Sequence, residues 1–172
     1  GHDTVEWAAQ LPYSNGKVGM FGGSYVGATQ MLTAIAHPPH LAGIFPVVTA
    51  SNYHDGWTYQ GGAFEQWFNE SWTSGLALDT YRRQMDGFVN ARQYDNVLPL
   101  NSYPLFNSSL LSPLLNLNRL APYFLDWLSH PNYDDYWKRW SIEEHYQDIQ
   151  APAYVVAAWY DIFQGGSLRN YL

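Results

Sequence analysis

The residue of this sequence best suited to chemistry is Ser24, in the stretch GGSYVG at residues 22–27. Residues 18–21 have the pattern of a short buried strand, and a helical pattern begins near Ser24. A serine on a sharp strand-to-helix turn holds its hydroxyl clear of the sheet, where a base and a substrate can both reach it. The first amides of the helix then lie where an oxyanion would form. This pattern is typical of a nucleophile elbow.

The spacing of the glycines leaves a second interpretation open. The usual elbow is Gly-x-Ser-x-Gly, which requires glycine at position 26, whereas this sequence has Val26 followed by Gly27. Gly22 and Gly23 could simply end a strand, with Ser24 capping the next helix, a position that serine favours. Short motifs often occur by chance, so other parts of the chain must separate the two interpretations.

A carboxylate follows a second apolar run. Residues 151–160 are almost continuously apolar and lead into Asp161. Functional groups of open parallel sheets lie just beyond the carboxyl ends of strands, so we expect Ser24 and Asp161 at the same edge. There the carboxylate can orient a histidine that removes the serine proton. The alternative is that Asp161 is a helix cap or turn residue.

The composition narrows the classes of partner. Aromatic residues make up 17% of the 172 residues, with 8 Trp and 14 Tyr, which favours an aromatic-lined pocket as well as a core. The net charge of −7 disfavours nucleic acid or an anionic membrane as partner. The sequence has no cysteine, so it offers no thiolate as nucleophile or metal ligand. The lack of cysteine does not fix the cellular compartment, although we expect the cytoplasm rather than secretion. No cofactor is expected, and a homo-oligomer is left open.

No metal site is expected either. The candidate pairs, His54-Asp55 and Asp134-Asp135, lack the spacing of metal ligands. We also find no run of about eighteen apolar residues, so we expect no membrane span.

The first fifty residues alternate between helix and strand. A helix is expected at 4–10, with Asp3 and Glu6 as a capping box, followed by the elbow strand, a helix from Ser24 to about residue 36, and a strand at 41–48. This order favours an α/β sheet.

Residues 51–150 lose the alternation, and we interpret them as a mostly helical insertion. Helical pattern is expected at 78–94, 120–128 and 131–140, with a polar connector at 96–118. The strand signal returns at residue 151. The domain organisation is therefore 1–50, an insertion at 51–150, and 151–172.

Several segments together resemble the cocaine-esterase-like (CocE/NonD) serine hydrolases, relatives of the X-Pro dipeptidyl peptidases and α-amino-acid ester hydrolases. They are the GxSYxG pattern at 22–27, DTVEWAAQLPYSNGKVGMFG before it, HPNYDDYWKRWS at 130–141 and WYDIFQGGS at 159–167. The extra residue before the last elbow glycine is normal in that family. The resemblance implies a partial α/β-hydrolase fold, with residues 51–150 as a helical cap.

The resemblance also assigns roles to residues. It implies Ser24 as nucleophile, the Tyr25 backbone amide as an oxyanion donor and Asp161 as the triad acid. It further implies that three aromatic side chains line the acyl pocket: Trp57, Trp72 and Phe163.

Two parts that the family requires are missing from this sequence. The triad histidine should follow the acid, but all six histidines, at positions 2, 37, 40, 54, 130 and 145, precede Asp161. We expect them to be surface or capping residues. The second oxyanion donor, a tyrosine side chain, should lie upstream of Gly1, and the family's jelly-roll domain is also absent. The chain is therefore expected to be the middle of a larger enzyme.

Two functions follow as hypotheses. The first is a serine hydrolase that cleaves esters or amides, as an acyl esterase, acylase or X-Pro dipeptidyl peptidase, through an acyl-enzyme. Its partner is a small-molecule ester or amide. The second is a non-catalytic α/β domain whose aromatic insertion binds an apolar ligand or a protein. A binding domain does not need a serine on a strained elbow together with an acid at a strand end.

Overall fold

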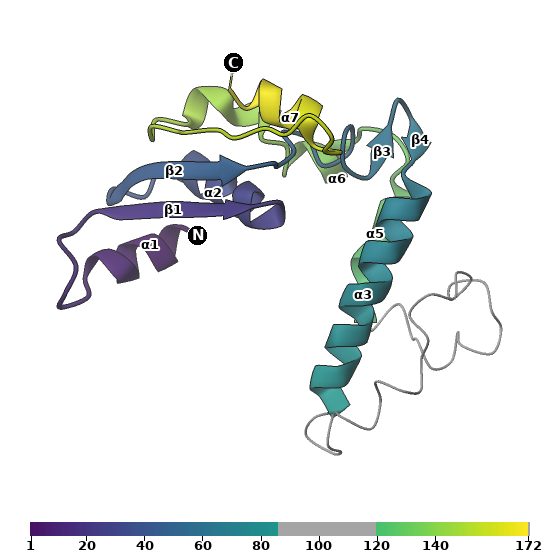
Figure 1. Ribbon diagram of the computed structural model, residues 1–172, viewed down its shortest axis with the longest axis horizontal. Helices are drawn as coiled ribbons and strands as arrows, with labels where there is room; N and C mark the ends of the chain where they lie inside the picture. Colours follow the sequence, from purple (N-terminus) through teal and green to yellow (C-terminus); the bar gives the residue numbers. More distant parts are fainter. Residues whose placement is uncertain (86–119, 172) are drawn as a thin grey trace. The chain divides into compact units, whose positions relative to one another are not determined.

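The computed structural model describes residues 1–85 and 120–171 (Figure 1). The chain divides into two compact units. The first unit consists of Gly1–Ala63 and Asn132–Leu172, and the second consists of Phe64–Pro131. The predicted insertion, 51–150, is thus longer than the second unit. Its two ends belong to the first unit, where the Ser51 carbonyl accepts a hydrogen bond of 3.0 Å from the Ile142 amide.

A parallel sheet is the centre of the first unit. Strand β1 (Val18–Gly23) pairs with β2 (Leu41–Val47), with one register irregularity between Val18 and Gly19. Residues 152–156 pair in parallel with the other edge of β2, through hydrogen bonds of 3.0 Å from Tyr154 N to Ile44 O and from Val156 N to Pro46 O. All three segments therefore end at the same edge of the sheet, as the predicted α/β order requires.

Helix α2 (Tyr25–Ile35) covers one face of this sheet. Met31 and Ala34 on the helix form a buried cluster with Ile44 of β2 and Ile142. Helix α1 (His2–Ala9) packs next to β1. Three further elements complete the unit: α6 (Asp135–Lys138), the 3₁₀ helix η2 (Glu143–Asp148) and α7 (Gln164–Arg169).

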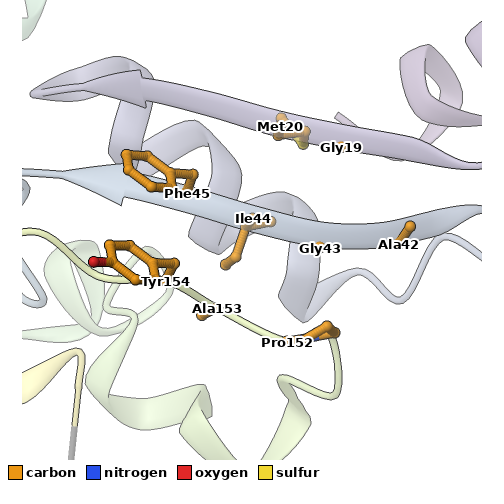
Figure 2. Close-up of a pocket in the computed structure, with 9 residues that line it drawn as sticks. All are labelled: Gly19, Met20, Ala42, Gly43, Ile44, Phe45, Pro152, Ala153 and Tyr154. Carbon is orange, nitrogen blue, oxygen red and sulfur yellow. The ribbon is translucent and has the colours of Figure 1, made fainter.

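The opposite face of the sheet is apolar and open among the described residues. Figure 2 shows the Phe45 and Tyr154 rings side by side. They stack with their centroids 5.0 Å apart and an angle of 3° between their planes. Gly19 and Gly43, which carry no side chain, line a shallow depression of about 480 Å³ together with the two rings. Phe21 is also exposed on β1, paired with Phe45 in the register.

The predicted capping box of the first helix is wrong. The helix starts at His2 with Gly1 as its N-cap, and it has no side-chain cap. The Glu6 carboxylate is used elsewhere, because it accepts hydrogen bonds from His40 N at 3.2 Å and from His40 Nδ1 at 2.7 Å. Glu6 therefore ties α1 to the segment that enters β2.

The last predicted strand is shorter than expected. Its pairing ends at Val156; residues 157–158 have no assigned secondary structure, and turns at 159–160 and 162–163 flank Asp161. The physical reason lies in β2, which leaves the sheet after Val47, so that no backbone partner remains beyond Val156.

A short hairpin lies where we expected no strands. Strands β3 (Tyr59–Gln60) and β4 (Ala63–Phe64) pair across Gly61 and Gly62, whose φ angles are +57° and +85°. Two residues with positive φ make the tight turn that suits a hairpin, and glycine adopts it without a steric penalty. The Gly-Gly pair was the signal for it in the sequence.

The second unit is helical in its described part. Helix α3 (Gln66–Met85) begins twelve residues earlier than predicted, and the rest of the helix expected at 78–94 lies outside the described residues, as does the connector at 96–118. Helix α5 (Pro122–Ser129) agrees with the predicted apolar helix. Ala77 on α3 packs with Leu120 and Ala121 at the start of α5.

Candidate active site

Ser24 occupies the junction between β1 and α2, as predicted. Its backbone has φ 59° and ψ −132°, a strained conformation for a residue with a side chain. The Ser24 amide donates to the Val47 carbonyl at 2.9 Å, and the Ser24 carbonyl accepts from the amides of Gly27 and Ala28 at 2.9 and 3.1 Å. The backbone on both sides of the turn is therefore held by hydrogen bonds.

The Ser24 hydroxyl is not used to cap the helix. Ser24 is the N-cap residue of α2, yet it makes no side-chain capping bond. No described residue forms a hydrogen bond with its Oγ, and the residue is partly exposed. The capping interpretation therefore does not account for a serine at this position.

The two outer glycines of the motif allow this turn. Gly22 has a φ of +142°, and a Cβ there would lie 2.7 Å from Val26 Cγ1. A Cβ at Gly27 would lie 2.9 Å from Thr49 Cβ. The close approach that the motif needs thus falls at position 27, whereas Val26 packs over Gly22. This explains why glycine is at 27 rather than 26.

A buried glutamine, which we did not single out from the sequence, ties the turn together. Gln30 is completely buried on α2, and its amide nitrogen donates to the carbonyls of Gly22 and Val26 at 3.0 and 3.1 Å. Its amide oxygen accepts from the Phe45 amide at 3.0 Å. The signal in the sequence was a polar residue on the helix face that carries Gly27, Met31 and Ala34.

A second strained residue lies at the same edge of the sheet. Val48, directly after β2, has a φ of 41°, which is rare for a β-branched side chain. Its amide donates to the Val156 carbonyl at 2.8 Å. Strained backbone tends to occur at functional sites, and here two such residues follow neighbouring strands.

Asp161 follows the third sheet segment at this edge, five residues beyond Val156. Its Oδ1 accepts a hydrogen bond of 2.8 Å from the Phe163 amide, in the turn that leads into α7. The turn interpretation of Asp161 is therefore correct for one carboxylate oxygen. Oδ2 accepts no hydrogen bond from a described residue, so it can still orient a partner.

Helix α7, which follows Asp161, is anchored to the segment after β2. A Cβ at Gly166 would lie 2.7 Å from Ala50 Cα, so only glycine permits this contact. Arg169 Nε donates to Glu143 Oε1 at 2.5 Å and to Ser51 Oγ at 3.1 Å. These contacts hold the Asp161 turn against the sheet, and nothing in the local sequence pattern indicated them.

The three expected pocket residues fall into two groups. Trp57 and Phe163 pack against each other in the first unit, with their ring centroids 4.6 Å apart, and both are buried. Trp72 belongs to the second unit, where its ring lies 6.3 Å from those of Tyr123 and Trp127. The acyl pocket as a whole stays a prediction.

The histidines do not complete a triad within the described residues. None of the six forms a hydrogen bond with Ser24 or Asp161. The expectation that all are surface or capping residues is wrong for His54, which is buried and stacks on Tyr59 at 4.6 Å with Trp137 edge-on at 5.4 Å. The backbone at this position is held by a hydrogen bond of 2.9 Å from the His54 amide to Asn52 Oδ1.

Two further properties concern the described residues only. They contain no group of three or more histidine, aspartate and glutamate side chains that could hold a metal ion. No helix among them has the length and apolar character needed to cross a membrane.

A serine on an elbow between a parallel strand and a helix is typical of α/β hydrolases. Here β1 carries the serine, β2 lies between, and Asp161 follows the segment that pairs with the far edge of β2. The whole chain, residues 1–172, matches the X-Pro dipeptidyl-peptidase (S15) family, and it belongs to that family. The resemblance seen in the sequence is thereby confirmed.

Individual relatives agree with this assignment. The chain is 33% identical over 186 residues to cocaine esterase from Rhodococcus sp. (strain MB1 Bresler), with 99% of this chain and 30% of the esterase covered. Its fold is similar to a CocE/NonD family hydrolase from Staphylococcus aureus, with a TM-score of 0.69 at 22% identity, covering 99% of this chain and 25% of the hydrolase. An aminopeptidase from a Thaumarchaeota archaeon gives a TM-score of 0.62 at 22% identity, covering 99% and 28% of the two chains. The chain thus spans less than a third of the length of these relatives.

Proposed function

We propose that this chain supplies the nucleophile and the acid of a serine hydrolase that cleaves esters or amides. The observation that carries the proposal is Ser24, which has a strained backbone at a strand-to-helix junction and a hydroxyl that takes no part in capping. Strain of this kind costs about 1–3 kcal/mol, and it persists where the surroundings over-determine it. A serine that only caps a helix would not require this backbone strain.

The proposed reaction proceeds through an acyl-enzyme. Ser24 Oγ attacks the carbonyl carbon of the substrate, and a histidine takes the hydroxyl proton. The Tyr25 amide, at the first position of α2, binds the oxyanion of the tetrahedral intermediate. The histidine then protonates the leaving alcohol or amine, and water releases the acyl group by the reverse sequence.

Asp161 is proposed to orient this histidine. Its Oδ1 is fixed by the Phe163 amide, so that Oδ2 can accept a hydrogen bond from an imidazole. Because no histidine of this chain forms a hydrogen bond with Ser24 or Asp161, we propose that the base and the second oxyanion donor lie elsewhere in a longer protein.

The substrate is proposed to be a small ester or amide. The relatives carry the names of esterases and peptidases, and both classes of substrate pass through the same intermediate. We further propose that residues 51–150 act as a cap and that Trp57, Trp72 and Phe163 contact the acyl group. A non-catalytic binding domain is less well supported, because it would not require the Ser24 geometry.

The test uses the longer protein proposed above. A fluorophosphonate probe should label the wild-type protein and fail to label Ser24→Ala, and hydrolysis of p-nitrophenyl butyrate should fall by roughly 10⁴-fold or more in that variant. Ser129→Ala is a matched control, because Ser129 lies at the end of α5 and its hydroxyl bonds only to the Asp126 carbonyl. Labelling that survives Ser24→Ala would exclude Ser24 as the nucleophile.

A further inference from the structure

The side chain of Gln30 is the most completely buried polar group next to the elbow. It has no exposed surface, and its amide makes three hydrogen bonds, all with backbone groups. Burial of a primary amide is costly unless its donors and acceptor are satisfied, and here each kind is used. The amide therefore serves a specific arrangement of the backbone.

The three backbone partners lie on both sides of Ser24 and on the neighbouring strand. The Gly22 carbonyl belongs to the end of β1, and the Val26 carbonyl belongs to the first turn of α2. The Phe45 amide belongs to β2. One side chain thus joins the strand before the serine, the helix after it, and the adjacent strand.

This arrangement bears directly on the strain at Ser24. The residue can keep a φ of 59° only while the segments on either side of it cannot relax. The Ser24 amide and carbonyl bonds fix the centre of the turn, and the Gln30 amide fixes its two flanks.

We propose that Gln30 is a positioning residue for the nucleophile, which keeps the flanks of the elbow together so that the Ser24 hydroxyl and the Tyr25 amide stay in their reactive places. The inference rests on the proposed function. A displacement of about 1 Å at a reacting group can cost roughly 10²-fold in rate. Loss of the Gln30 amide should therefore lower the rate of the chemical step and leave substrate binding largely unchanged.

The experiment compares Gln30→Met and Gln30→Glu with wild type in the longer protein. Met has a similar length and none of the hydrogen bonds, so we expect kcat and the rate of fluorophosphonate labelling to fall together by roughly 10- to 100-fold, with KM close to wild type. Thr33→Val is the matched control. Thr33 is buried on the same helix, but its hydroxyl bonds to the Thr29 carbonyl and not to the elbow. Its loss should lower stability without lowering kcat.

The Gln30→Glu variant separates positioning from stability. A neutral carboxyl can donate one hydrogen bond and accept another, whereas the ionised form donates none. We therefore expect the ratio of variant to wild-type kcat to rise as the pH falls and the introduced carboxyl becomes protonated. The rates are measured at a temperature well below the unfolding temperature of both proteins. A purely structural role leaves this ratio constant while the protein is folded.

Each outcome decides the matter. A folded Gln30→Met variant with wild-type kcat and labelling rate overturns the inference. If that variant does not fold, a pH-independent ratio for Gln30→Glu overturns it. Failure of the proposed function gives a different result. If Ser24 is not the nucleophile, the Ser24→Ala variant keeps its activity and its fluorophosphonate labelling.

Discussion

Among single residues, the proposed site depends on a strained serine and on a carboxylate to which we assign two separate uses. Ser24 is held in its conformation by backbone hydrogen bonds to Val47, Gly27 and Ala28. Asp161 stabilises a turn with one oxygen and leaves the other for the proposed histidine. The two uses of Asp161 can be separated experimentally, because an amide can replace the carboxylate in the turn but cannot stabilise an imidazolium.

We expect Asp161→Asn to lower kcat of the longer protein by roughly 10⁴-fold with little change in the unfolding midpoint, since its side-chain oxygen can still accept from the Phe163 amide. Ester hydrolysis and thermal unfolding measure the two effects. Asp148→Asn is the control, because Asp148 bonds to His145 in η2 and has no contact with Asp161. Near-normal turnover by Asp161→Asn would mean that Asp161 is only a turn residue.

Between elements, side-chain hydrogen bonds tie helices α1 and α7 to segments far away in the sequence. Arg169 joins α7 to η2 and to Ser51, and Glu6 joins α1 to the start of β2. The hydrogen bond from the His40 side chain to Glu6 holds the pKa of this carboxyl below its usual value. Since the folded state prefers the ionised form, the Glu6 link stabilises above the ordinary pKa of glutamate and is lost as the pH falls through the lowered value.

We therefore expect the unfolding temperature of the wild type to exceed that of Glu6→Gln above about pH 5, and the difference to shrink in more acidic solution. Thermal unfolding of the longer protein across this pH range measures it. Asp3→Asn is the control, since Asp3 lies in the same helix and bonds only to the neighbouring His2. A difference that stays constant as the carboxyl titrates would show that the charge of Glu6 is not involved.

At the scale of the whole molecule, the first unit leaves apolar sheet surface open among the described residues. Phe21 is 81% exposed and Tyr154 67% exposed, and the stacked pair in Figure 2 belongs to this face. No described strand pairs with the outer edge of β1. Open apolar faces and strand edges favour association.

We expect residues 1–172, produced alone, to associate and to show no ester hydrolysis above a Ser24→Ala control with p-nitrophenyl acetate or butyrate. A missing triad member costs roughly 10⁴- to 10⁶-fold, and a missing oxyanion donor a further ~10²- to 10³-fold. Light scattering after size-exclusion chromatography and initial rates are the measurements. Serine-dependent turnover by this chain would show that one of its own histidines is the base.

The local pattern of residues 18–48 was sufficient to predict the strand, the elbow, the helix and the second strand. The signals for these elements are glycines and apolar runs that lie within a few residues of each other. Short-range steric effects are therefore sufficient to decide where each strand and helix begins and ends. The family resemblance came from the same kind of local evidence, in residues 22–27 and 159–167.

Only the tertiary structure decided which distant groups meet. The contacts of Gln30 with Phe45, of Glu6 with His40 and of Arg169 with Glu143 depend on register and on the direction in which segments return to the sheet. Likewise, the end of β2 sets where the segment before Asp161 stops pairing. Propensity and periodicity carry no information about such pairs, because the side chains involved are separated in sequence and are brought together by packing.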